Sequence, residues 1–140
     1  MSTRKAIVLD ANILIRGVFG RKVRQILNAF EDRTTFYAPD VCFRDAEKYT
    51  SQLSRRHGID PSVPMAVLEG FVRLVHPVHS SFYADYKKAA IRRVRDPEDW
   101  PIVAVAMLLG IPIWTEDQDF FGSGIAIWTT DRVELFLSDP

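Results

Sequence analysis

Short apolar runs alternate with helical patterns along most of this chain. Residues 6–9 are all apolar, which is typical of a strand buried on both faces of a parallel sheet. Four further short runs are rich in β-branched and aromatic residues, and such residues favour strands. These runs predict strands at 36–38, 72–75, 113–115 and 125–128.

Apolar side chains recur at helical spacing between these strands. The spacing predicts helices at 13–19, 21–30, 39–56, 65–71, from Ser80 or Ser81 to 94, at 100–109, and from Thr130 or Asp131 to 137. Gly110 and Pro112 end the helix over 100–109, because glycine suits the left-handed cap and proline cannot continue a helix. The alternation predicts an α/β fold, a three-layer α/β/α sandwich around a central, mainly parallel sheet of about five short strands.

The composition narrows the class of protein. The 140 residues are 47% hydrophobic and 26% charged, which suits a single domain over residues 1–140. Eighteen basic residues balance eighteen acidic ones, so any contact with nucleic acid must come from local patches. The single cysteine, Cys42, excludes an internal disulfide. The first residues are too polar to begin a signal peptide and no apolar run reaches membrane length, so we expect a soluble, cytoplasmic protein.

Several carboxylates stand at the carboxyl ends of predicted strands or at the start of a helix. Asp10 follows the first strand, Asp117 and Asp119 follow the fourth, and Asp99 begins the helix before it. The carboxyl ends of parallel strands share one edge of a sheet, where ligands bind. Carboxylates gathered there repel one another unless a cation or a proton relieves them. These four acids therefore predict a metal site, although each could singly be a cap or turn residue.

The predicted helix over 39–56 offers two more candidate catalytic acids, Asp45 and Glu47. At about 100° per residue, one stripe of this helix contains Cys42, Asp45, Ala46, Tyr49 and Leu53. We expect that stripe to face the core and Glu47 to face solvent. Asp45 is the better candidate, and Glu47 is the alternative.

The type of ligand indicates the chemistry. Carboxylates without a neighbouring cysteine or histidine form an all-oxygen site, which suits Mg²⁺ or Mn²⁺ better than structural zinc. Such an ion activates water and neutralises a phosphate oxygen during hydrolysis, so the pattern favours phosphoester chemistry. Glycine-rich phosphate loops are absent from the sequence, which excludes a P-loop or dinucleotide-binding protein.

Four segments carry a resemblance to the PIN-domain family of metal-dependent ribonucleases. They are VLDANILI at 8–15, YAPDVCFRDAEKY at 37–49, DPEDWPIVAVAMLLG at 96–110 and WTEDQDF at 114–120. The resemblance implies that Asp10, Asp99 and Asp117 bind the metal, with Asp119 as a frequent fourth acid. It also implies that Asn12 and Thr115 shape the site.

The same family usually has a glutamate six residues after the position that opens the long helix. Counting from Pro39 leads to Asp45, whereas the glutamate of this chain is Glu47. The sequence thus departs from the family pattern, and both residues stay candidates.

A PIN domain of this size resembles the toxins of type II (VapBC-like) toxin–antitoxin pairs. That resemblance implies an RNA substrate, a small antitoxin partner, a homodimer and a cytoplasmic location. Two alternatives stay open: a PIN protein that acts in RNA processing, and a non-catalytic interaction domain whose acids are structural.

Basic side chains near the acids could hold the RNA backbone. They are Arg16, Arg21, Arg92, Arg93 and Arg95. Solvated helix faces explain the same residues equally well.

Overall fold

The computed structural model describes residues 4–139, and its centre is a sheet of five parallel strands in the order β3-β2-β1-β4-β5. The strands are β1 (Lys5–Leu9), β2 (Thr34–Pro39), β3 (Val75–Val78), β4 (Ile113–Trp114) and β5 (Ile127–Trp128). The parallel sheet and the helices around it confirm the predicted α/β/α fold class.

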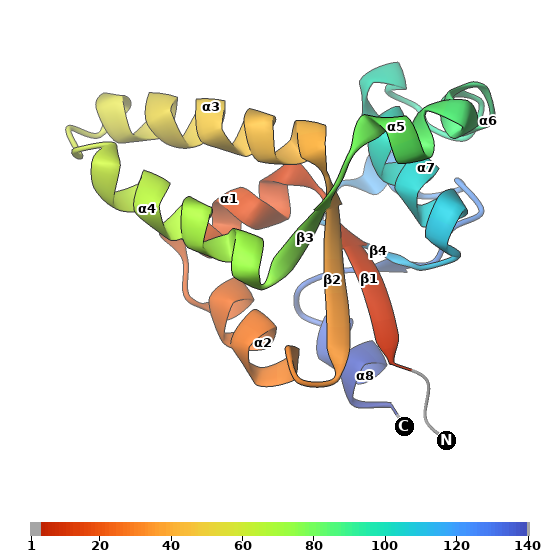
Figure 1. Cartoon of the computed structure of the whole chain (residues 1–140), viewed down its shortest axis with the longest axis horizontal. Helices are drawn as coiled ribbons and strands as arrows, with labels where there is room; N and C mark the ends of the chain where they lie inside the picture. The colour runs from red at the N-terminus through yellow and green to blue at the C-terminus, as the bar shows by residue number, and fades with distance from the viewer. Residues whose placement is uncertain (1–3, 140) are drawn as a thin grey trace.

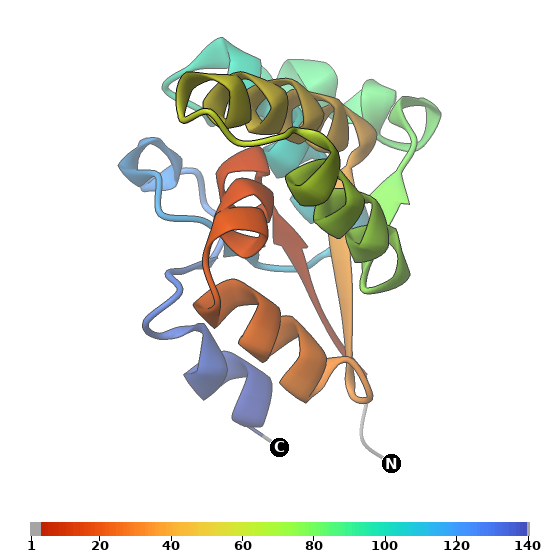
Figure 2. The same cartoon turned by 90° about the vertical axis from the view of Figure 1, so that its left-hand side faces the viewer.

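Helices cover both faces of this sheet. In Figure 1, α1 to α4 lie on the left of the strands and α5 to α7 lie on the right; Figure 2 shows α8 beside α2. The α-helices are α1 (Ala11–Phe19), α2 (Lys22–Phe30), α3 (Asp40–Arg56), α4 (Ser62–Gly70), α5 (Ser80–Tyr83), α6 (Lys87–Ile91), α7 (Trp100–Leu109) and α8 (Val133–Ser138). Short 3₁₀ turns are η1 (Phe71–Arg73), η2 (Ala84–Tyr86), η3 (Pro97–Asp99) and η4 (Gln118–Phe120). Within residues 4–139, no helix is long and apolar enough to cross a membrane.

Helix α7 is apolar around its whole circumference because it is covered on more than one side. It packs on β1 and β2 with one face and on α5 and α6 with another, so its residues Pro101 to Ala106 are all buried. The helix ends where predicted: Gly110 has φ +66° and its N–H bonds to the carbonyl of Ala106.

The predicted third strand was misplaced. The sequence predicted it at 72–75, whereas β3 is Val75–Val78 and the preceding residues form η1. Pro77 lies inside β3, because this strand is at the edge of the sheet and its outer side needs no backbone N–H donor. The preceding helix α4 also begins at Ser62, three residues before the predicted start.

Several predicted helix boundaries were also wrong. The helix expected over 80–94 is divided into α5, η2 and α6 and ends at Ile91, and its cap is the His79 ring rather than a serine hydroxyl. Helix α3 begins at Asp40, because Pro39 still belongs to β2. Helix α8 begins at Val133 without a side-chain cap, so neither predicted capping residue begins it.

The strand order creates a crevice at the carboxyl ends of β1 and β4. The chain passes from β1 to β2 and β3 on one side, and then returns to β4 and β5 on the other. Ligands bind at such a switch point in open parallel sheets. Leu9 pairs with Trp114 across the two strands, so the next residues, Asp10 and Thr115, emerge side by side.

Candidate active site

Asp10 and Thr115 form the base of the crevice, and both are buried. One oxygen of Asp10 accepts a hydrogen bond of 2.9 Å from the N–H of Ile13, which caps α1, and the other accepts one from the Thr115 hydroxyl. The oxygen of that hydroxyl in turn accepts a bond of 3.0 Å from the N–H of Asp117. Thr115 therefore joins the carboxylate after β1 to the loop after β4.

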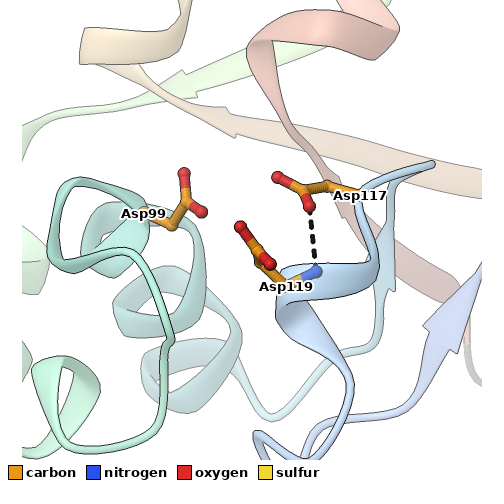
Figure 3. Close-up of side chains that lie close together, drawn as sticks. All are labelled: Asp99, Asp117 and Asp119. Atoms are coloured by element: carbon orange, nitrogen blue, oxygen red, sulfur yellow. Dashed lines mark hydrogen bonds between the residues drawn. The ribbon is translucent and has the colours of Figure 1, made fainter.

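Three aspartates converge above this base. Carboxylate oxygens of Asp99, Asp117 and Asp119 all lie within 4.8 Å of one another, and Figure 3 shows the three side chains pointing toward a common centre. The N–H of Asp119 donates a bond of 2.9 Å to Asp117, which orients that carboxylate. We call these three residues the aspartate trio.

The carboxylate of Asp99 has no capping role. Although Asp99 precedes α7, its side chain makes no cap hydrogen bond; the cap of the preceding turn η3 is Asp96, which accepts from the N–H of Glu98 at 3.0 Å. Glu116 is also structural, since it accepts from the N–H of Thr130 at 2.6 Å. Within residues 4–139 the Asp99 carboxylate thus accepts no backbone hydrogen bond, whereas those of Asp96 and Glu116 each accept one.

The environment raises the pKa values of two site acids. Burial raises the pKa of Asp10 to about 6, against the opposing hydrogen bonds from Thr115 and Ile13, and repulsion from Asp117 adds to the effect. Burial also raises the pKa of Asp99 to about 7, and repulsion from Asp96 and from the other site aspartates is the second cause. The surrounding protein groups therefore do not neutralise the negative charge of the site.

A groove of about 480 Å³ extends from these acids along α3. Its walls come from α1, from α3 and from the segment of η3 and α7; Figure 2 looks toward the far end of α3, with α1 below it. Asn12 and Asp45 line the groove, whereas Glu47 is exposed and lies outside the lining. Of the two candidate acids on α3, Asp45 therefore borders the groove and Glu47 does not.

The predicted core stripe of α3 was wrong in part, since Cys42 and Ala46 are buried but its other members are not. Its buried residues are Cys42, Phe43, Ala46, Thr50 and Ser54, because α1 and α4 pack on that face. Asp45 and Tyr49 are exposed and border the groove instead. The stripe predicted from the sequence thus lies between the core face and the groove face of α3, and it contains residues of each.

The basic residues predicted to hold RNA lie elsewhere. None of Arg16, Arg21, Arg92, Arg93 and Arg95 belongs to the lining of the groove. Arg93 has a structural bond of 2.9 Å to the Ser123 carbonyl. The cation in the groove lining is Arg56, which the sequence analysis missed. Its spacing from Asp45, with Tyr49 and Gln52 between them, is the helical signal that could have found it.

The trio suits a hard divalent cation. Its donors are all oxygens, and in an octahedral Mg²⁺ site two opposite oxygens lie about 4.2 Å apart. The spread of the trio, at most 4.8 Å, needs only a small closure. Burial raises the pKa of the nearby Cys42 thiol well above its ordinary value, so that thiol is uncharged and a poor ligand. Of the four acids predicted to bind metal, three are at ligand spacing, and the buried Asp10 is not among them.

Comparisons with known proteins identify the family. A family model described as "PIN domain" matches residues 8–138. The chain therefore belongs to the PIN-domain family, which confirms the resemblance seen in its sequence. No curated protein matches the chain.

Solved structures share the fold at low sequence identity. The DNA-bound VapBC structure from Salmonella typhimurium contains a similar chain that is 19% identical, with a TM-score of 0.66 and coverage of 91% of this chain and 99% of that chain. A toxin–antitoxin complex from Klebsiella pneumoniae contains one that is 20% identical, with a TM-score of 0.61 and coverage of 89% and 97%. A protein from Pyrobaculum aerophilum is 13% identical, with a TM-score of 0.73 and coverage of 96% and 90%. At these identities the likeness concerns the fold.

Proposed function

We propose that this PIN-domain protein is a Mg²⁺- or Mn²⁺-dependent endoribonuclease and the toxin of a type II toxin–antitoxin pair. The observation that carries the proposal is the aspartate trio, which gathers three carboxylates without a basic residue among them. Membership of the PIN-domain family supports the nuclease activity. The folds shared with chains of a VapBC structure and of a toxin–antitoxin complex support the toxin role.

In this proposal the trio holds the cation, with Asp10 beneath it. When bound, the ion supplies an activated water and neutralises charge on the phosphate. Thr115 fixes the Asp10 carboxylate through its hydroxyl and the Asp117 loop through its oxygen. Asp45 provides a further carboxylate on the α3 wall, and Asn12 provides an amide at the start of α1.

The proposal extends to partners and location. The substrate is RNA, a small antitoxin protein covers the site, and the chain forms a homodimer in the cytoplasm. The antitoxin is supported by the toxin–antitoxin assemblies among the similar structures. The other assignments follow from the family resemblance.

Cleavage of RNA tests the proposal. Total RNA and a random-sequence RNA pool are incubated with the protein and Mn²⁺ or EDTA, and new ends are counted by sequencing. We expect cleavage that EDTA abolishes and that Asp117→Asn lowers by at least about 100-fold, because even residues that only orient metal ligands contribute 10- to 100-fold. Asp32→Asn is the matched control, since Asp32 is exposed and precedes β2 at the opposite edge of the sheet. Equal cleavage by wild type and Asp117→Asn contradicts the proposal.

The same assay separates the two acids of α3. We expect Asp45→Asn to lower the cleavage rate by about 10-fold or more, an effect typical of a positioned acid or base. Glu47→Gln is its control and leaves the rate unchanged, because Glu47 lies outside the groove. The reverse result assigns the role to Glu47.

A further inference from the structure

The far part of the groove has a composition unlike that of the acid end. Four of its lining residues are Tyr49, Gln52, Leu53 and Arg56, all on α3. We call this part the distal groove. It contains an aromatic ring, an amide and a guanidinium but no carboxylate, so its chemistry differs from that of a cation site.

These side chains follow one line along α3. Asp45, Tyr49, Gln52 and Arg56 are spaced by four, three and four residues, which places them within about 60° of the helix circumference. At about 1.5 Å per residue, the line from Asp45 to Arg56 is roughly 16 Å long. The distal groove is thus a track that begins beside the proposed reaction site.

Neither the ring nor the guanidinium has a structural task that explains its position. Tyr49 is 53% exposed, and among residues 4–139 its hydroxyl makes no hydrogen bond. In the same part of the chain, Arg56 makes no ion pair, whereas Arg44 on the same helix bonds to Asp40. Arg56 is also the one basic residue in the described lining of the groove.

We propose that the distal groove binds single-stranded RNA, with Tyr49 stacked on a base and Arg56 on a backbone phosphate. The inference rests on the proposed function for the reaction that follows binding. An exposed aromatic face can stack only on a base that is unpaired, which selects single strands over duplex. The guanidinium suits phosphate oxygens, and the amide of Gln52 can donate to and accept from base edges. The acids at the other end then receive the phosphate that follows the bound base.

Binding of a labelled RNA, followed by fluorescence anisotropy, tests this assignment. The Asp117→Asn chain with Mg²⁺ is the background, so that cleavage does not consume the probe. Tyr49→Leu is expected to weaken binding of a short single-stranded RNA by about 5-fold or more, the lower range for loss of one stacked base. Tyr49→Phe keeps the ring and the affinity. Binding of the same RNA as a duplex is expected to be equal in all three.

The contact proposed for Arg56 is tested by the salt dependence of RNA affinity. Loss of one phosphate contact lowers the slope of log affinity against log salt by about 0.7 for a single strand. We expect that change in Arg56→Gln but not in Tyr49→Leu. Arg55→Gln is the matched control: Arg55 is in the same last turn of α3 but outside the groove, so it reports any effect of the helix dipole.

The possible results separate this inference from the nuclease proposal. Unchanged RNA affinity in both Tyr49→Leu and Arg56→Gln overturns the assignment and leaves the distal groove to a protein segment, whether or not the wild type cleaves RNA. Equal effects of Arg55→Gln and Arg56→Gln also overturn it. Weaker binding in a protein that cleaves no RNA supports the groove and contradicts the nuclease. Thermal unfolding of each variant confirms that these exposed substitutions leave the fold intact.

Discussion

Two aspartates at the same edge of the sheet have opposite environments. Asp40 follows β2 as Asp10 follows β1. Desolvation alone would raise the pKa of Asp40, but hydrogen bonds from Tyr83, Ser80 and Val41 lower it below its ordinary value. The pKa of Asp10 is raised to about 6 because its burial is deeper and its charged neighbours are acids.

The difference lies in the partners of each carboxylate. Arg44 lies 3.7 Å from Asp40, so that carboxylate has a cation of its own. Within residues 4–139 Asp99 has no such partner; burial raises its pKa to about 7, and repulsion from the neighbouring aspartates adds to the effect. A place at the carboxyl edge of the sheet therefore does not define a site acid. What defines it is a charge that the protein itself leaves unpaired.

The largest expected effect concerns stability. Asp40→Ala removes a charged acceptor and leaves the Tyr83 hydroxyl and the Ser80 N–H without their partner, so we expect a loss of about 2–4 kcal/mol. Asp99→Ala relieves repulsion and is expected to be neutral or stabilising in metal-free protein. Urea unfolding with EDTA at about pH 8 measures both variants. Equal destabilisation of the two would remove the distinction between paired and unpaired acids.

Thr115 tests whether the base of the site orients the acids above it. Thr115→Val keeps the shape but removes the hydroxyl between Asp10 and Asp117. We expect Mn²⁺ affinity to fall by about 10- to 100-fold, the range for residues that orient metal ligands. Thr115→Ser retains the hydroxyl and serves as the control, with near-normal affinity expected. Normal affinity in the valine variant would show that the hydroxyl has no orienting role.

The smallest expected effect is in the pH dependence. The pKa values of Asp10 and Asp99 are raised to about 6 and about 7, so the folded state binds protons that the unfolded chain releases above the ordinary aspartate pKa of 3.8. The free energy of unfolding of metal-free protein should therefore fall as pH rises from about 4 to about 7. Asp99→Asn should make this fall shallower, which unfolding curves across that range would detect. An unchanged slope would contradict the assigned environment of Asp99.

Much of the fold follows from local sequence patterns. The apolar run before Asp10 and the helix bounded by Asp99 and Gly110 both have strong local signals, and the structure contains them close to where they were predicted. The convergence of acids from β1 and β4 also follows, because parallel strands share their carboxyl edge.

The remaining features depend on tertiary packing. Pro77 is compatible with a strand only because β3 is at the sheet edge, and no local pattern reveals strand order. Which face of α3 borders the groove depends on where α1 and α4 pack. The sequence could therefore identify Asp45 as a candidate acid and still assign its neighbour Tyr49 wrongly to the core. Arg56 was missed for the same reason, because the sequence alone does not show that the helix face it shares with Asp45 borders a groove.

Calorimetric titration with Mn²⁺ tests the central claim, that unpaired aspartates create a divalent-cation site. The wild type and Asp117→Asn are titrated at about pH 7 in two buffers of different protonation enthalpy. We expect binding by the wild type with release of protons, because the cation displaces those held by Asp99 and Asp10. We expect little or no binding by Asp117→Asn. Absence of binding by the wild type, or equal binding by both proteins, would contradict the claim.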